Sequence, residues 1–196
     1  TEANGLQETF DGNPVTTGDT VYGETNSPPT LTILGDNPYT LEWGTNFTTV
    51  DPGVTSSDPD GDTTTDGYSE TSPNDPTTIH TALGSYTIRY YAEDGKGNNN
   101  VTYKDRTVNV VESVAPSITL LGDNPQEINE GVLWSDPGYT VNDNYDPPSS
   151  VSVNVDDAPD DDPGEYTVTY TATDTSGNAT VVTRTVRVIS LGSPPS

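Results

Sequence analysis

The sequence repeats itself, and this repetition constrains the fold more than any other feature of the chain. Residues 28–38 read PPTLTILGDNP and residues 115–125 read APSITLLGDNP, so the pentapeptide LGDNP returns unchanged. Three further pairs of segments match in the same order: 48–58 with 133–143, 84–98 with 164–178, and 106–111 with 184–189. The distance between matching segments shortens along the chain, which places insertions in loops of the first copy, because paired strands do not tolerate them. The chain therefore contains two tandem domains of one fold.

Each copy has the residue alternation of β-strands. In residues 165–174 of the second copy, EYTVTYTATD, aromatic or aliphatic side chains alternate with threonine, which is the period of a half-buried strand. Gly, Pro, Asn and Asp interrupt such runs about every 8–12 residues. No segment has the i, i+3, i+4 apolar spacing of a helix. We predict an all-β fold of two tandem β-sandwiches with about seven strands each and no helix.

The repeats divide the chain into four parts. We place the first domain at residues 28–112 and the second at residues 113–192. Residues 193–196, SPPS, resemble SPPT at 27–30 and are expected to be a linker towards a further repeat. Residues 1–27 form an extended N-terminal segment with too few apolar side chains for a domain. Three interpretations of it stay open: a leader, a remnant of a preceding domain, or a strand exchanged with a neighbouring subunit.

The composition excludes several classes of function. The chain has 31 acidic and 6 basic side chains and a net charge of −25, so it does not suit a nucleic-acid backbone or an anionic membrane surface. It contains no cysteine and one histidine, His80, which we expect to be exposed or on an edge strand. Thiol chemistry, disulfides and Cys/His zinc sites are thereby excluded. No motif indicates an enzyme, and no apolar run reaches the roughly 18 residues of a membrane-spanning helix.

The repeated motifs resemble a known family. The pattern P-x-I-T-L-L-G-D-N-P, an aromatic residue shortly before D-P-G, then G-x-Y-T-V-x-Y-x-A-x-D-x-x-G-N and R-T-V-x-V is similar to bacterial immunoglobulin-like (Ig-like) domains of the group 3 type, over residues 28–189. The resemblance implies two Ig-like sandwiches, a location outside the cell or on its surface, and a non-enzymatic role as spacer or adhesin. The partners that it implies are neighbouring Ig-like repeats or identical subunits, and glycans or proteins of a cell surface.

Two other classes of function stay open. The chain is alternatively a polymerising subunit of an extracellular filament or surface layer, in which residues 1–27 add a strand to the sheet edge of a neighbour. A further alternative is a carbohydrate-binding accessory module of a secreted hydrolase. Against that alternative, neither Trp43 nor Trp134 has the neighbouring aromatic and amide residues of a sugar-binding platform.

An arginine is retained at the same place in both copies. Arg106 and Arg184 share the strand parity of valines that are expected to face the core. A buried guanidinium needs a partner, because its desolvation is costly. We predict that Arg106 pairs with Asp51 and Arg184 with Asp136, the aspartates of the two D-P-G turns, or that each stacks on a tyrosine. The alternative is a register break that turns both arginines to the solvent.

Two aromatic residues and three glycosylation motifs are further candidate sites. Phe47 and Trp134 stand at corresponding positions before D-P-G and are expected to be core aromatics. Sequons occur at Asn46, Asn100 and Asn178. Their number is what chance predicts at this composition, so they indicate glycosylation sites only in an organism that modifies asparagine.

Acidic loops suggest a cation site. The segment DPDGD at 58–62 places carboxylates at alternate positions, so one turn can direct several oxygens to one ion, and calcium takes six to eight oxygen ligands. The turns after the long strands are expected at the same end of each sandwich. The alternative is that these are solvated turn aspartates. The candidate calcium ligands are Asp58, Asp60, Asp62 and Asp94 in the first domain and Asp143, Asp146 and Asp174 in the second.

Overall fold

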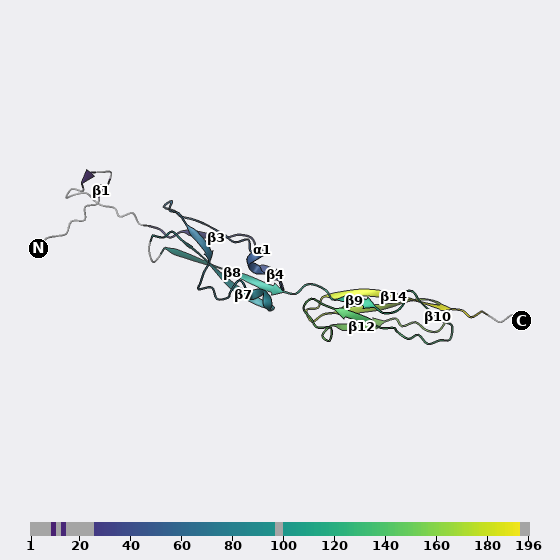
Figure 1. The fold of residues 1–196 in the computed structure, drawn as a ribbon. Helices are drawn as coiled ribbons and strands as arrows, with labels where there is room; N and C mark the ends of the chain where they lie inside the picture. The colour runs from purple at the N-terminus through teal and green to yellow at the C-terminus, as the bar shows by residue number, and fades with distance from the viewer. Residues whose placement is uncertain (1–8, 11–12, 15–25, 97–99, 193–196) are drawn as a thin grey trace.

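The computed structural model describes residues 9–10, 13–14, 26–96 and 100–192, and in them the chain forms two β-sandwiches. Figure 1 shows the two sandwiches following one another end to end, with the first in blue to teal and the second in green to yellow. The all-β class and the two-sandwich architecture are confirmed. None of the described residues belongs to a helix that is long and apolar enough to cross a membrane.

The first sandwich packs a two-stranded sheet against a four-stranded sheet. The small sheet pairs two antiparallel strands, β3 (Thr30–Ile33) and β5 (Val54–Ser57). The large sheet has the order β4 (Tyr39–Glu42), β8 (Val101–Val111), β7 (Gly84–Glu93) and β6 (Thr65–Tyr68). Within it, β4 runs parallel to β8 and the other pairs are antiparallel.

The second sandwich repeats this arrangement. Its small sheet pairs β9 (Ser117–Leu120) with β11 (Tyr139–Asn142). Its large sheet has the order β10 (Gln126–Asn129), β14 (Ala179–Ile189), β13 (Gly164–Thr173) and β12 (Ser152–Asp156). Each sandwich thus has six strands, where the sequence predicted about seven. Between the second and third strand of each domain, residues 43–53 form turns and a short helix and residues 130–138 form a loop.

Two short helices contradict the prediction that no helix forms. The first, α1 (Phe47–Val50), begins after Asn46, whose side-chain oxygen accepts a hydrogen bond from the Thr48 backbone N–H at 3.1 Å. Phe47 is fully buried and holds this turn against the core. The second, η1 (Ile79–Thr81), is a single 3₁₀ turn that contains His80. His80, which was expected to be exposed or on an edge strand, is thus half-buried in a turn.

The cores follow the predicted alternation. In β7, Ile88, Tyr90 and Ala92 are buried between less buried neighbours, and in β13 the same holds for Val168 and Tyr170. These positions pack against valines of β8 and β14 that have the same parity. Burying such side chains is worth about 1.5–3 kcal/mol each. The few apolar residues of the chain are therefore concentrated where the sheets face each other.

Within the N-terminal segment, β1 (Thr9–Phe10) and β2 (Asn13–Pro14) form an antiparallel pair. The three interpretations of this segment, strand exchange among them, and the linker predicted at residues 193–196 concern residues that lie almost entirely outside the described ones.

Candidate cation site at the domain junction

Three carboxylates meet where the first domain passes into the second. Glu112 follows the end of β8, Asp143 lies in the loop between β11 and β12, and Asp174 lies in the turn between β13 and β14. One oxygen from each lies within 4.8 Å of the other two, and across residues 26–96 and 100–192 no other group of three such ligands is so close. Glu112 and Asp174 are more than nine-tenths buried. Carboxylate oxygens without sulfur or nitrogen ligands suit a hard cation.

The loop that contains Asp143 leaves one of its oxygens unpaired. Oδ1 accepts hydrogen bonds from the backbone N–H groups of Tyr145 (2.8 Å) and Asp146 (2.7 Å), which fixes the side chain. Oδ2 is buried and has no hydrogen-bond partner. An unpaired buried carboxylate oxygen is costly, so this atom is suited to a ligand.

Asn178 connects the other two carboxylates. Its side-chain N–H₂ donates to Glu112 Oε2 and to Asp174 Oδ2, each at 2.8 Å. Its backbone N–H donates to Asp174 Oδ1 at 2.8 Å, and the Val114 N–H donates to Glu112 Oε1 at 2.7 Å. A glycan on Asn178 would disturb this bridge, because the sequon nitrogen is the atom that makes it.

The pKa values of the two buried carboxyls move in opposite directions. Burial raises the pKa of Glu112, and the negative charges of Asp174 and Asp143 raise it further. For Asp174, burial opposes ionisation, but hydrogen bonds from Asn178 and the adjacent backbone outweigh it and lower the pKa. A cation between them would remove the repulsion that Glu112 experiences.

Of the three aspartates predicted in the second domain, Asp143 and Asp174 belong to this cluster and Asp146 does not. Both Asp146 oxygens accept hydrogen bonds from the Thr175 hydroxyl, at 2.9 and 2.7 Å, and Oδ2 also accepts from the Thr175 N–H at 2.8 Å. Asp146 therefore ties the two loops together. Glu112 was missed because it lies at the predicted domain boundary and has no acidic counterpart, since the corresponding residue after β14 is Ser190.

The predicted set in the first domain is not gathered into a comparable cluster. Asp58 Oδ1 accepts from the Asp60 N–H at 2.8 Å, as Asp143 does in its own loop, and Asp58 Oδ2 is likewise buried without a partner. Asp62, however, forms an ion pair with Lys96 at 3.1 Å. Asp94 accepts a hydrogen bond from the Asn26 side chain at 2.9 Å. Lys96 thus places a positive charge beside these carboxylates.

Aromatic and polar contacts cross the same junction. The rings of Trp43 and Tyr145 meet edge to face, with centroids 5.1 Å apart. Glu42 accepts hydrogen bonds from the Ser113 N–H (3.2 Å) and hydroxyl (2.6 Å). Tyr145 lies in the Asp143 loop, so the acidic cluster and the aromatic contact share one structural element.

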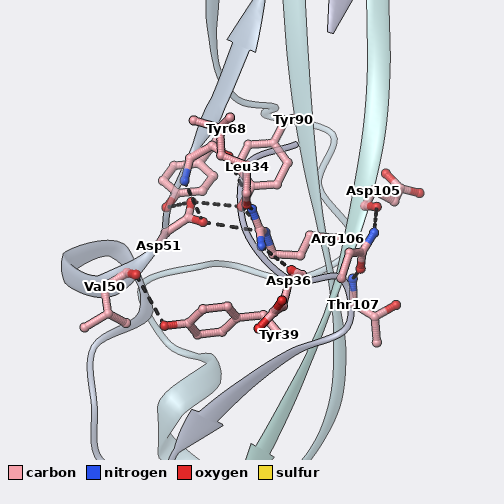
Figure 2. A network of polar contacts seen from close by, with 12 residues as sticks. Leu34, Asp36, Tyr39, Val50, Asp51, Tyr68, Tyr90, Asp105, Arg106 and Thr107 are labelled. Carbon is pink, nitrogen blue, oxygen red and sulfur yellow. Dashed lines mark hydrogen bonds and ion pairs between the residues drawn. The ribbon is translucent and has the colours of Figure 1, made fainter. Parts of the chain in front are cut away.

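A second buried polar network surrounds Arg106 (Figure 2). The guanidinium is fully buried and donates to the carbonyl oxygens of Leu34 and Asp36, both at 2.5 Å, and to Gly53 at 3.2 Å. It also donates to the Tyr90 hydroxyl at 3.1 Å and lies 3.6 Å from Asp51. Leu34 and Asp36 belong to the first LGDNP, so the repeated pentapeptide wraps the arginine.

The second domain has the same network. Arg184 donates to the carbonyl oxygens of Asp123 (2.5 Å) and Leu121 (2.6 Å) and to the Tyr170 hydroxyl (3.2 Å). Its distance to Asp136 is longer, 3.9 Å, and that carboxylate instead accepts from Tyr170 at 2.8 Å. The structure thus places both arginines inward and beside the predicted aspartates.

Burial and the nearby carboxylate also act on the tyrosines of the first domain. Desolvation raises the pKa of Tyr68 and of Tyr90, and the Asp51 carboxylate raises both further because each hydroxyl donates to its Oδ2. Both phenols therefore stay protonated as donors over the ordinary pH range. Of the two predicted core aromatics, Phe47 is fully buried, while Trp134 is partly buried and donates to Gln126 at 2.8 Å.

Comparison with known proteins finds one family model that matches the second domain. Residues 118–188 match the family model described as the Ig-like domain of bacterial surface proteins. The second domain matches the bacterial surface Ig-like family. This family of modules is generally non-catalytic. No curated protein matches the sequence.

Several solved structures are similar to parts of the chain. A lipoprotein from Bacteroides thetaiotaomicron is 29% identical over 41% of this chain and 41% of its own, with a TM-score of 0.33. This chain thus matches less than half the length of that lipoprotein. Fibronectin(III)-like modules of Clostridium thermocellum CbhA are 16% identical over 85% of this chain and 99% of theirs (TM-score 0.34). Domains EC1-2 of human protocadherin-24 are 15% identical over 86% of this chain and 100% of theirs (TM-score 0.33).

Proposed function

We propose that this chain is a non-enzymatic spacer or adhesive module of a microbial surface protein, held in a defined domain arrangement by calcium at the junction. The supporting observation is the junction itself, where an acidic cluster and the Trp43–Tyr145 contact share one loop. A flexible linker would need neither. The contacts stabilise one arrangement of the domains, which is what a spacer requires.

Calcium is the ion that this donor set favours. Glu112, Asp143 and Asp174 each bring one carboxylate oxygen to this point, Asp143 has an oxygen without a hydrogen-bond partner, and calcium completes its six to eight oxygen ligands with water at flexible angles. Magnesium demands a stricter octahedron and keeps its water more firmly. Extracellular calcium modules typically bind with Kd of about 10⁻⁴–10⁻³ M.

The proposed rigidity predicts how the domains tumble in solution. With calcium, ¹⁵N relaxation should give both domains one rotational correlation time; in EDTA, or in Tyr145→Ala, the two domains should show different and shorter times. Tyr145→Ala removes the ring that contacts Trp43, and Tyr145 does not belong to either core cluster. We expect the melting temperature of each domain to fall by less than about 4 °C, since under 1 kcal/mol of packing is lost.

Tyr103→Ala is the matched control, because Tyr103 is a half-exposed tyrosine on the face of the first domain. It should leave the common correlation time unchanged. Independent tumbling of the wild-type domains in calcium would contradict the spacer proposal. A molecular mass that grows with protein concentration would favour the filament alternative instead.

A further inference from the structure

The first domain has a pocket between two of its edge strands, β5 and β6. The pocket has a volume of about 270 Å³. The residues that line it include Asp51, Val54, Asp66, Tyr68 and Tyr90. It lies beside the Arg106 network, and Figure 2 shows Tyr68, Tyr90 and Asp51 grouped there.

The second domain has valines and a tyrosine at the corresponding positions. Strand pairing with the matching residues of β7 and β13 shows that Val155 replaces Tyr68 and Val153 replaces Asp66. The same comparison in the small sheets shows that Tyr139 replaces Val54, and its ring meets Tyr170 at 5.9 Å. The two domains share the arginine network but differ here. The residues that line this pocket are therefore not dictated by the shared fold.

The pocket combines negative charge with aromatic rings. Asp66 pairs with Ala92 in the register of β6 and β7, and Ala92 is buried, so Asp66 is on the strand face that meets the core. Asp66 accepts a hydrogen bond from Ser56 at 2.6 Å but has no ion pair among the described residues, whereas Asp51 lies beside Arg106. The rings of Tyr68 and Tyr90 lie 5.3 Å apart. A carboxylate beside tyrosine rings is the environment that binds an organic cation.

We propose that this pocket binds a primary ammonium group on an alkyl chain, as on a lysine side chain of a partner protein. The alkyl stem would pack on Val54 and Tyr68, and the ammonium would pair with Asp66. The charge of −25 on the whole chain attracts a basic partner to this surface. This site is distinct from the junction and does not depend on calcium.

The test is a titration of the ¹⁵N-labelled chain, in EDTA, with Nα-acetyl-lysine methylamide. We expect saturable amide shifts confined to the pocket, at Gly53, Val54, Gly67 and Tyr68, with Kd on the order of 1–10 mM. The norleucine analogue has the same stem without the ammonium and should bind at least about tenfold more weakly. Added salt should weaken lysine binding by screening the pair.

Variants make the proposal falsifiable. Val54→Tyr copies the second domain and should abolish binding, while Asp66→Asn should weaken it at least about fivefold. Asp157→Asn, which removes one exposed charge from the second domain at a φ of 65° that asparagine tolerates, should bind like wild type. Equal shifts with the norleucine analogue, no saturable shift below about 100 mM probe, or wild-type binding by a folded Val54→Tyr would overturn the proposal. In each of these outcomes the role of Asp66 is only to keep the edge strand β6 from pairing with a strand of another molecule.

Discussion

Arg184→Ala is expected to destabilise the second domain by about 3–5 kcal/mol, a fall of at least about 12 °C in its melting temperature. The side chain is fully buried, and its loss leaves the carbonyl oxygens of Leu121 and Asp123 inside the fold without their donor. Asp136 also loses its nearby cation. Thermal unfolding followed by tryptophan fluorescence measures the effect. Because each domain has one tryptophan, a Trp43→Phe background leaves Trp134 as the reporter of the second domain.

Arg187→Ala is the matched control on the same strand. Arg187 forms an exposed ion pair with Glu165 at 2.9 Å, so its loss should cost no more than about 1 kcal/mol. If Arg184→Ala melted no lower than wild type, the structural role of the arginine would be excluded. Arg106→Ala should act in the same way on the first domain and leave the Trp134 transition in place.

The fold could be predicted because the repeat identifies the two domains and the alternation of side chains identifies their strands. The alternation in residues 165–174 determines which side chains of the second domain face the core. The matching strand of the first domain alternates in the same way. The pentapeptide LGDNP marks the repeat in the sequence, and the structure gives it a role in the fold. Its backbone carbonyls at Leu34 and Asp36 bind the arginine of a strand some 70 residues later in the chain. That contact depends on backbone atoms, which a sequence motif does not identify.

The candidate cation site was predicted only in part because its residues come from two domains. Repeat comparison finds what both copies share, and Glu112 has no acidic equivalent at Ser190. The motif at residues 58–62 was favoured because its carboxylates stand at alternate positions, yet Lys96 lies against Asp62 there. The spacing of carboxylates within one loop therefore predicts a site less well than the convergence of loops and a linker at one junction.

Calcium should raise the melting temperature of the second domain, and Asp143→Asn should abolish that rise. For wild type we expect about 2 kcal/mol of added stability when calcium exceeds its Kd roughly thirtyfold. Asparagine keeps the Oδ1 acceptor for the Tyr145 and Asp146 N–H groups and places an amide donor where the unpaired Oδ2 stands. In EDTA the variant should therefore melt at or above the wild-type temperature, because one of three clustered negative charges is gone.

Asp58→Asn distinguishes the junction from the first domain, because Asp58 has the same loop geometry and the same unpaired oxygen. If the ion binds at the junction, this variant keeps the calcium response that Asp143→Asn loses. Loss of the response in Asp58→Asn alone would move the ion to the first domain. An unchanged melting temperature of wild type between EDTA and millimolar calcium would exclude both sites. The comparison depends on the difference between two matched aspartates, so a general effect of salt on so acidic a chain cannot imitate it.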